Sequence, residues 1–247
     1  MLIEHKSHNI PIRKYYFTQP EKPCWRDLLL PTAYMDCYSA HKPRFFSVEN
    51  RQTLLTDLSP EEESIFKNFP KDTRNQIRRG EQNGVLHCNL ATDKQQFVTI
   101  FNRFATLRGL SRFSVQEIDN YGANNYCLLS MDKDSQAVIC HLYLLCHKSK
   151  VASLLASVSD PQYDDDTEMR KLIGHANRFL HWQGMRHLKS RGILTYDWCG
   201  YVPNTQDIEL QGINRFKRTF NGIPTPIYNY YSPAYGFIEH LRKKLRK

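Results

Sequence analysis

A carboxylate and a tyrosine stand at the end of an apolar segment in the second half of the chain. Asp197 follows Tyr196 in the run 193–198, and Gly200 comes just after it. A carboxylate at a strand end can take a proton from an amine or hold a substrate hydroxyl, and it can also cap a turn. Tyr196 is a candidate acid by residue type alone, since the chain has 14 tyrosines. These residues indicate proton-transfer chemistry and leave a structural role open.

Lys217 is a second candidate, in the segment 213–220. Apolar residues recur there at helical spacing, so Phe216 and Phe220 are expected in the core. Lys217 then projects beside that face, and Arg215 lies in the same helix. A fixed cation in this place could bind a phosphate or stabilise an oxyanion, and the alternative is a solvated surface lysine.

Arg74, Arg78 and Arg79 form a basic patch on another expected helix, with residues 74 and 78 on one face. Such a patch could clamp the phosphates of a donor, a glycan pyrophosphate or an RNA backbone. Ion pairing with the acidic residues 61–63 is an equally favoured alternative.

Histidine and cysteine spacings give no metal signature. His175, His181 and His187 are six residues apart on one expected helix, which does not place two rings on one face. The seven cysteines are scattered, odd in number and without a Cys-x-x-Cys pair. Neither a zinc site nor a disulfide framework is therefore expected, and no Ser-His-Asp or Cys-His signature is evident. The sequence predicts a metal-free site with reduced thiols.

The elements that position these residues follow from capping signals and apolar periodicity. Ser59 with Pro60 predicts a helix start, and Gly84 and Gly192 predict helix ends. Helices are expected at 59–69, 72–83, 95–108, 114–118, 168–191, 213–220 and 237–246. Strands are expected at 126–130, 137–146, 151–158, 193–198 and 224–231, with a loop at 204–211.

The order of these elements predicts an α+β or mixed α/β fold. Residues 1–50 give short strands and loops, expected as an N-terminal extension packed on the core. Residues 51–236 are expected to form the main domain, and residues 237–247 a basic C-terminal helix.

The net charge of +9 favours a polyanionic partner. RNA, the phosphates of a nucleotide cofactor and an anionic membrane surface all fit, and a merely soluble basic protein is the alternative. No apolar run approaches the roughly 20 residues of a membrane-spanning helix, and the N-terminus lacks a secretory signal. A cytoplasmic location is expected.

The C-terminus concentrates part of this charge beside an apolar stripe. Such a segment could rest peripherally on the inner face of an anionic membrane, or pack on the domain as a structural helix with a solvated basic tail. The apolar positions are Phe237, Ile238, Leu241 and Leu245, and the basic ones are Arg242, Lys243, Lys244, Arg246 and Lys247.

Three segments, over about residues 50–230, resemble the Fem-type family of peptidoglycan-bridge and related cell-envelope acyltransferases. The first is Thr56-Asp-Leu-Ser59 followed by Arg74-Asn-Gln-Ile-Arg78 and Gly84-Val85. The second is Ile173-Gly174-His-Ala-Asn177 running to Tyr196-Asp197-Trp-Cys-Gly200. The third is Gly212-Ile213-x-Arg215-Phe216-Lys217-x-x-Phe220-Asn-Gly222. The chain departs from the family in having length for one acetyltransferase-like half where full Fem proteins carry two, and in having Asn221 where a glycine is usual.

The resemblance implies the acetyltransferase (GNAT) fold, with a central splayed mixed sheet flanked by helices. It makes Lys171-x-x-Gly174-x-Ala176 a pyrophosphate loop between a strand and the long helix, where Gly174 would let the backbone approach a phosphate. It places His175 and Asn177 beside that loop, and it adds Arg74, Arg78 and Arg215 to the donor or substrate contacts. Tyr196, Asp197 and Lys217 become the catalytic candidates.

The sequence thus predicts a metal-free N-acyltransferase acting on an amine of a cell-envelope glycan or peptidoglycan-type precursor, which could be lipid-linked. The donor is acyl-CoA or aminoacyl-tRNA. The loop match favours CoA, and the basic charge suits both. The alternative function is a catalytically inactive module of the same fold that binds RNA or an anionic membrane surface.

Overall fold

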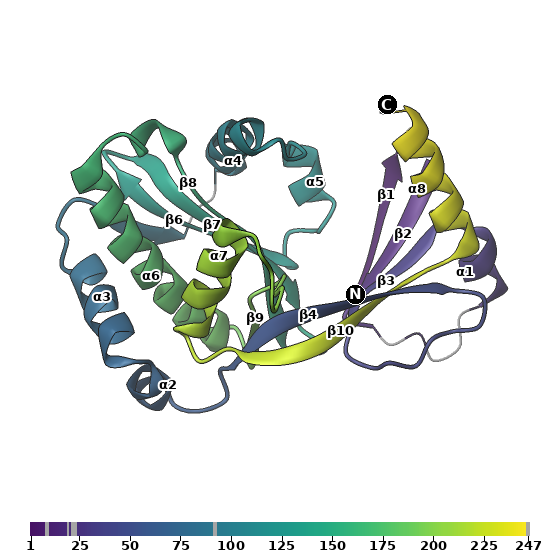
Figure 1. The fold of residues 1–247 in the computed structure, drawn as a ribbon, viewed down its shortest axis with the longest axis horizontal. Coiled ribbons are helices and arrows are strands. Elements are labelled where there is room, and N and C mark those ends of the chain that lie inside the picture. The colour runs from purple at the N-terminus through teal and green to yellow at the C-terminus, as the bar shows by residue number, and fades with distance from the viewer. Residues whose placement is uncertain (8–9, 19, 21–23, 91–92, 246–247) are drawn as a thin grey trace. The chain divides into compact units, whose positions relative to one another are not determined.

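The computed structural model describes residues 1–7, 10–18, 20, 24–90 and 93–245, which fold into two compact units (Figure 1). Unit 1 consists of Met1–Thr53, Gly200–Asn204 and Pro224–Lys247. Unit 2 consists of Leu54–Cys199 and Thr205–Ile223. The sequence-based boundaries at 50/51 and 236/237 differ from these because residues after 223 fold together with the N-terminal segment.

Unit 2 is built on a mixed sheet whose centre is the expected antiparallel meander. The pairing of β8 with β9 is parallel, and the other described pairings are antiparallel. In spatial order the strands are the end of β4 (Ser47–Asp57), β9 (Thr195–Asp197), β8 (Val151–Ser159), β7 (Gln136–Cys146), β6 (Tyr126–Lys133) and β5 (His87–Leu90). The three strands expected over 126–158 are therefore confirmed.

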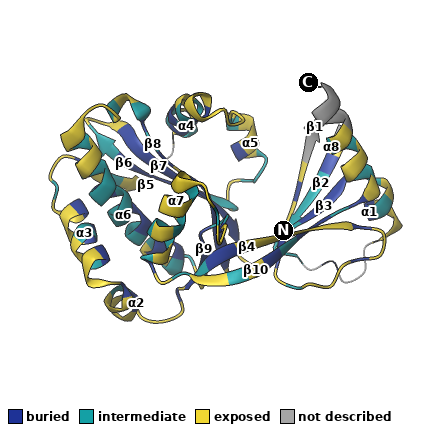
Figure 2. Cartoon of the chain, viewed as in Figure 1, coloured by how far each residue is buried: buried dark blue, intermediate teal, exposed yellow. Residues whose placement is uncertain are grey.

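Helices cover both faces of this sheet, as Figure 1 shows. Along β7, Cys140 and Leu142 enter the apolar cluster formed with α4 (Lys94–Arg108) and α5 (Val115–Asp119). The alternate residues His141 and Tyr143 reach the opposite helix, α6 (Thr167–Ser190). Many residues of the central strands are buried, and these parts of the strands are dark blue in Figure 2. The remaining elements are α2 (Glu62–Asn68), α3 (Lys71–Glu81), a 3₁₀ turn (Pro161–Tyr163) and α7 (Ile208–Arg218). The mixed α/β fold is confirmed.

Two helix starts differ from the sequence prediction. Ser59 does not cap α2, because its amide and hydroxyl both bond to the Asp57 carboxylate at 2.8 and 2.9 Å. Glu61 takes the cap position in place of Ser59, so helix α2 begins two residues later than predicted. Helix α7 begins inside the expected loop, because the Asp207 carboxylate accepts hydrogen bonds from two amides of its first turn. Hydrogen bonds to a nearby aspartate side chain therefore determine where both helices start.

Gly80 is required by the close packing of α3 on α6. A Cβ at this position would lie 2.4 Å from the His175 carbonyl oxygen and 2.8 Å from Phe179 Cβ. Gly80→Ala is therefore expected to destabilise the protein by about 1–3 kcal/mol, because the backbone of α6 must move. Gly174→Ala, in α6 with nothing within 4 Å of the added methyl, should stabilise it by about 0.5–1 kcal/mol. Urea midpoints compare the two, and equal midpoints would refute the close-packing argument.

Unit 1 joins the two ends of the chain in one sheet. Strand β1 (Leu2–Ser7) pairs with β2 (Ile10–Tyr16), β2 runs parallel to β3 (Thr32–Cys37), and β3 pairs antiparallel with β10 (Ile223–Tyr231). Helices α1 (Trp25–Leu29) and α8 (Pro233–Leu245) are neighbours in this unit (Figure 1).

Helix α8 begins four residues before the expected C-terminal helix and is described as far as Leu245. Residues 246–247 lie outside the described part of the chain. None of the helices in the described residues is long and apolar enough to cross a membrane.

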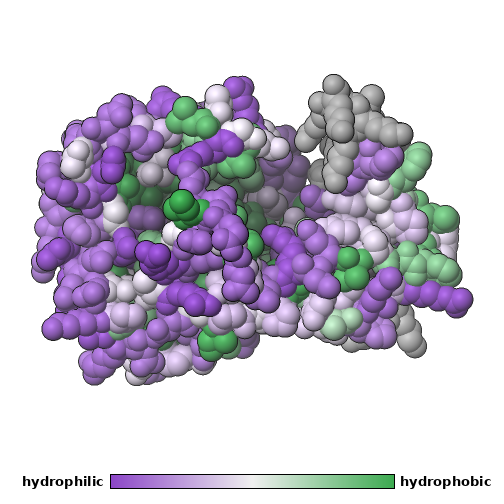
Figure 3. Space-filling view, in the orientation of Figure 1, coloured by the Kyte–Doolittle hydropathy of each residue, from purple (hydrophilic) through white to green (hydrophobic). Residues whose placement is uncertain are grey.

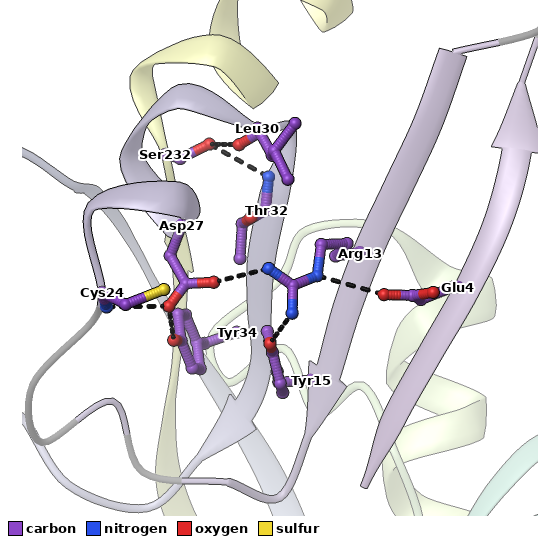
Figure 4. A network of polar contacts seen from close by, with 9 residues as sticks. All are labelled: Glu4, Arg13, Tyr15, Cys24, Asp27, Leu30, Thr32, Tyr34 and Ser232. Carbon is purple, nitrogen blue, oxygen red and sulfur yellow. Dashed lines mark hydrogen bonds and ion pairs between the residues drawn. The ribbon is translucent and has the colours of Figure 1, made fainter.

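A polar network fastens α1 to the sheet of unit 1 (Figure 4). The buried Asp27 carboxylate accepts from Arg13 at 3.0 Å, from the Tyr34 hydroxyl at 3.2 Å and from the Cys24 amide at 3.0 Å. Arg13 also pairs with Glu4 at 3.2 Å. Because a buried carboxylate is stable only when it is paired, this network holds α1 in one orientation.

Candidate functional site

Strands β8 and β9 part after a short parallel pairing, which we call the β8/β9 fork. They pair only through Val151–Ser153 and Thr195–Asp197, and β8 continues to Ser159 paired with β7. Leu155 is an extra residue in β8 at a register shift against β7, which leaves the regular ladder interrupted there. Beyond Asp197 the chain turns away through Cys199 and Gly200, with φ of 49° and 43°. The opening of the sheet near Asp197, expected from the resemblance, is present.

Polar groups from three segments meet at the base of the fork. Asp197 is fully buried, and its Oδ1 accepts a hydrogen bond from the Cys199 amide at 2.9 Å. Lys217, from α7, donates its ammonium to the Cys199 carbonyl. Ser153, from β8, places its hydroxyl 2.6 Å from Cys199 Sγ. The structure therefore brings Asp197 and Lys217 to one turn, around Cys199.

Lys217 is partly buried. Burial lowers its pKa below the ordinary lysine value, and the nearby Cys199 and Asp197 oppose that shift by favouring the ammonium. A desolvated ammonium acts strongly on any negative charge that forms beside it. The arrangement suits stabilisation of an oxyanion.

A chain of buried rings runs behind the fork. His181 Nδ1 lies 2.8 Å from the Tyr196 hydroxyl, which donates to the Tyr143 hydroxyl at 3.2 Å, and Tyr143 lies 3.0 Å from His141 Nδ1. His141 Nε2 lies 2.7 Å from Asn177 Oδ1. Because an amide oxygen only accepts, His141 carries its proton on Nε2 and its Nδ1 accepts from the Tyr143 hydroxyl. The Tyr196 hydroxyl then donates to Tyr143, and Nδ1–H of His181 donates to Tyr196.

Burial favours the neutral form of both imidazoles in this hydrogen-bonded chain. Burial lowers the pKa of His141 to about 4 and lowers that of His181 well below its ordinary value. Their rings are tilted at 35° with centroids 4.0 Å apart, and His141 also contributes to the lowered pKa of His181. His181 Nε2 is buried with no hydrogen-bond partner among the described residues, and the ring packs against Trp198 and Phe220. This nitrogen can accept a proton, but protonation would place a charge on a buried ring, which is energetically unfavourable.

Tyr196 is therefore a member of a hydrogen-bonded chain and not an exposed acid. It is fully buried, and desolvation raises its pKa well above the ordinary tyrosine value. Gly184 makes room for the chain, because a Cβ there would meet the Tyr143 hydroxyl at 2.5 Å.

The structure places the expected phosphate loop inside a helix. Lys171 and Gly174 lie in the second and third turns of α6, and the helix begins at Thr167. The exposed amides at its start are taken by the Asp166 carboxylate, which accepts from Glu168 and Met169 at 3.0 Å. Lys171 pairs with Glu168 at 2.8 Å. The expectation of free amides at Gly174 was wrong, because Asp166 starts the helix earlier.

The neighbours of that segment have structural partners. Asn177 accepts from His141 and, at 3.4 Å, from Ser157 of β8. The backbone carbonyl of His175 packs against Gly80 of α3. Burial lowers the pKa of the His175 ring. Asn177 thus links α6 to the arm of β8 beyond the fork, whereas His175 faces α3.

The arginine candidates are not gathered at the fork. Arg74 donates to the carbonyls of Lys67 and Phe69, which satisfies the end of α2. Arg78 is exposed and stacks over the Phe66 ring, 5.5 Å from its centroid. Arg215 is exposed on α7. The expected pairing of this patch with residues 61–63 does not occur among the described ion pairs, in which Glu62 contacts Arg186 and Glu63 contacts Lys67.

Sequence reasoning missed His141, Tyr143 and the role of Cys199. Their partners come from β7, α6 and β9, far apart in the chain, so no spacing motif exists. One signal was available, since His141 interrupts an otherwise apolar strand and a polar residue there requires a buried partner. Cys199 showed no signal, since its position depends on the turn after Asp197. Within the described residues, no group of three His, Cys, Asp or Glu side chains could hold a metal ion.

The forked sheet, the long helix after its middle strands and the terminal helix–strand pair belong to a fold that this chain shares with FemX. FemX is similar over 96% of this chain and 85% of its own, with a TM-score of 0.65 and 9% identity. The C-terminal domain of a putative lysylphosphatidylglycerol synthetase from Agrobacterium fabrum is similar over 98% of this chain and 83% of its own, with a TM-score of 0.57 and 13% identity. At such identities the likeness shows the fold alone. No protein-family model and no curated protein matches the sequence.

Proposed function

We propose that this protein is an N-acyltransferase that moves an acyl or aminoacyl group from an activated donor to an amine of a cell-envelope glycan or peptidoglycan-type precursor. The observation that carries the proposal is the partly buried ammonium of Lys217 beside Asp197 and the Cys199 turn, at the place where β8 and β9 part. The Fem-type fold supports the reaction class, and the resemblance of the sequence supports the acceptor class.

The reaction requires little beyond positioning and charge stabilisation. The amine nitrogen attacks the donor carbonyl, the carbonyl oxygen becomes an oxyanion, and the C–O or C–S bond to the donor breaks. The amine loses one proton, and the leaving alcohol or thiol gains one, so no external reagent is needed. Lys217 would face the oxyanion. Asp197 is fully buried with one oxygen bonded to the Cys199 amide, so we assign it to positioning Lys217 and keeping it charged.

The choice of donor follows from α6. The run Asp164–Asp166 precedes the helix, and Asp166 occupies its first amides, where the pyrophosphate of CoA would otherwise bind. A carboxylate in that place repels an anion. Aminoacyl-tRNA is therefore the donor favoured by the proposal, and acyl-CoA is the competing one.

Transfer from the two donors can be compared directly. The protein is incubated with tRNA charged with labelled amino acids, or with labelled acetyl-CoA, together with nucleotide-linked amino sugars and peptidoglycan precursors. The expected product carries label from tRNA in an alkali-stable amide, and Lys217→Met should abolish it. Transfer from acetyl-CoA alone would overturn the donor assignment. Tight binding of tRNA without any transfer to an amine would favour the inactive binding module.

A further inference from the structure

Two neighbouring helices of unit 1 expose large apolar side chains. Trp25 and Leu29 of α1 are 66% and 69% exposed, and Phe237 in the first turns of α8 is 64% exposed. Trp25 and Leu29 are four residues apart, so they share one face of α1. Figure 3 shows hydrophobic side chains gathered over α1, at the right of the view. We call Trp25, Leu29, Phe237 and the adjacent Arg26 the α1–α8 face.

This face is held in place by the protein and is not a loose segment. Asp27, between Trp25 and Leu29 in sequence, points inward and is bonded to Arg13, Tyr34 and the Cys24 amide (Figure 4). Leu28 packs against the buried cluster around Tyr34 and Tyr230. With Asp27 and Leu28 fixed on the inside, Trp25 and Leu29 are kept outward, where most of their apolar surface is exposed.

The positive charge of the chain is concentrated in the same unit. Unit 1 contains 13 Lys or Arg and six Asp or Glu, a net charge of +7, whereas unit 2 contains 21 and 19, a net charge of +2. Five of the basic residues of unit 1 are in the sequence from residue 242 to the C-terminus. Arg26 lies over the Trp25 ring, 5.4 Å from its centroid.

Exposed tryptophan, leucine and phenylalanine beside concentrated positive charge fit an anionic lipid surface. Tryptophan and arginine side chains are favourable at the level of the lipid headgroups, and leucine and phenylalanine can insert into the upper acyl chains. Lysines add electrostatic attraction to anionic lipids. RNA would use the charge and the aromatic ring but would leave Leu29 exposed. We infer that the α1–α8 face of unit 1 docks on an anionic bilayer. The inference extends the sequence-based expectation for residues 237–247 to α1 and does not depend on acyl transfer.

Vesicle binding by the full chain tests the inference. Co-sedimentation is measured with vesicles of phosphatidylcholine alone and with added phosphatidylglycerol, at low and moderate salt. Wild type should bind the anionic vesicles and lose affinity as salt rises. Leu29→Glu should weaken binding by about tenfold or more, because a carboxylate is placed in the contact. The matched control is Leu107→Glu in unit 2, because Leu107 is also 69% exposed. The Leu107→Glu variant should bind anionic vesicles as the wild type does.

Tryptophan fluorescence shows which side chain meets the lipid. Acyl-brominated lipid should quench the wild type, and Trp25→Phe should bind but lose most of that quenching. The other two tryptophans, Trp182 and Trp198, both lie in unit 2, where Trp182 is half-buried and Trp198 is buried. Absence of vesicle binding by wild type, or equal loss in both glutamate variants, overturns the inference. So does a Leu29-dependent change of oligomeric state without vesicles, which would make the face a contact between copies. Binding to tRNA that Leu29→Glu weakens as strongly would assign the face to RNA.

Discussion

Lys217→Met is expected to lower turnover by about 100-fold or more, with the fold retained. The ammonium is partly buried and bonded to the Cys199 carbonyl, so water screens a charge that forms beside it less than at the surface. A loss of 100-fold corresponds to about 2.7 kcal/mol of transition-state stabilisation. Methionine keeps the length and apolar body of the side chain, which limits the effect on packing. Steady-state rates of amide formation, with the donor that supports transfer in the comparison proposed above, measure the loss.

The rate of the wild-type enzyme should depend on pH in a direction set by the charge of Lys217. Burial lowers the pKa of Lys217, and the proposed role needs the protonated form. Activity should therefore be present below that pKa and be lost as pH rises through it, at a lower pH than an exposed lysine would give. Lys217→Arg should remove this alkaline limb, because arginine stays charged.

Arg215→Met is the matched control for Lys217→Met. Arg215 lies on the same helix and is exposed, so its loss removes an equal charge without touching the Cys199 turn. We expect less than about a threefold change in rate, in line with an exposed charge. If Arg215→Met lowers turnover as much as Lys217→Met, the general charge of α7 matters and the specific position of Lys217 does not.

The elements of unit 2 could be predicted from sequence because their signals are local. The apolar runs of β6, β7 and β8 and the long periodic pattern of α6 appear in the structure within a few residues of the expected bounds. The errors fall where two local signals compete. The Ser59 hydroxyl is bonded to Asp57 and is therefore not used to cap α2. Asp166 caps α6, so the helix already includes the glycine that suggested a phosphate loop.

The candidate site could be predicted only in part, because its contacts are long-range. Asp197 and Lys217 were found by residue type and by the resemblance, and they do meet at one turn. The His181–Tyr196–Tyr143–His141 chain needs the packing of three elements and leaves no spacing in the sequence. The pairing of β3 with β10, which joins the ends of the chain in unit 1, is equally invisible to a local pattern.

Asp197→Asn separates the two roles that this carboxylate could have. Asparagine keeps an oxygen that can accept from the Cys199 amide, so the turn should persist, while the negative charge near Lys217 is lost. Removing that charge lowers the pKa of Lys217 further, because Asp197 favours the ammonium. We expect turnover to fall by about 100-fold at mildly alkaline pH, and the alkaline limb to move to lower pH.

The shape of the pH profile decides between the mechanisms. A shifted limb with partial recovery at lower pH means that Asp197 acts through Lys217. A uniform loss at every pH, with the limb unmoved, would mean that the carboxylate itself takes the amine proton, and the positioning role would be wrong. An unchanged rate would leave Asp197 as a turn residue only. Asp197→Ala, which also removes the acceptor for the Cys199 amide, should lose stability as well as activity, because a buried N–H is then unpaired. Melting temperatures of the two variants therefore distinguish the loss of charge from the loss of the turn.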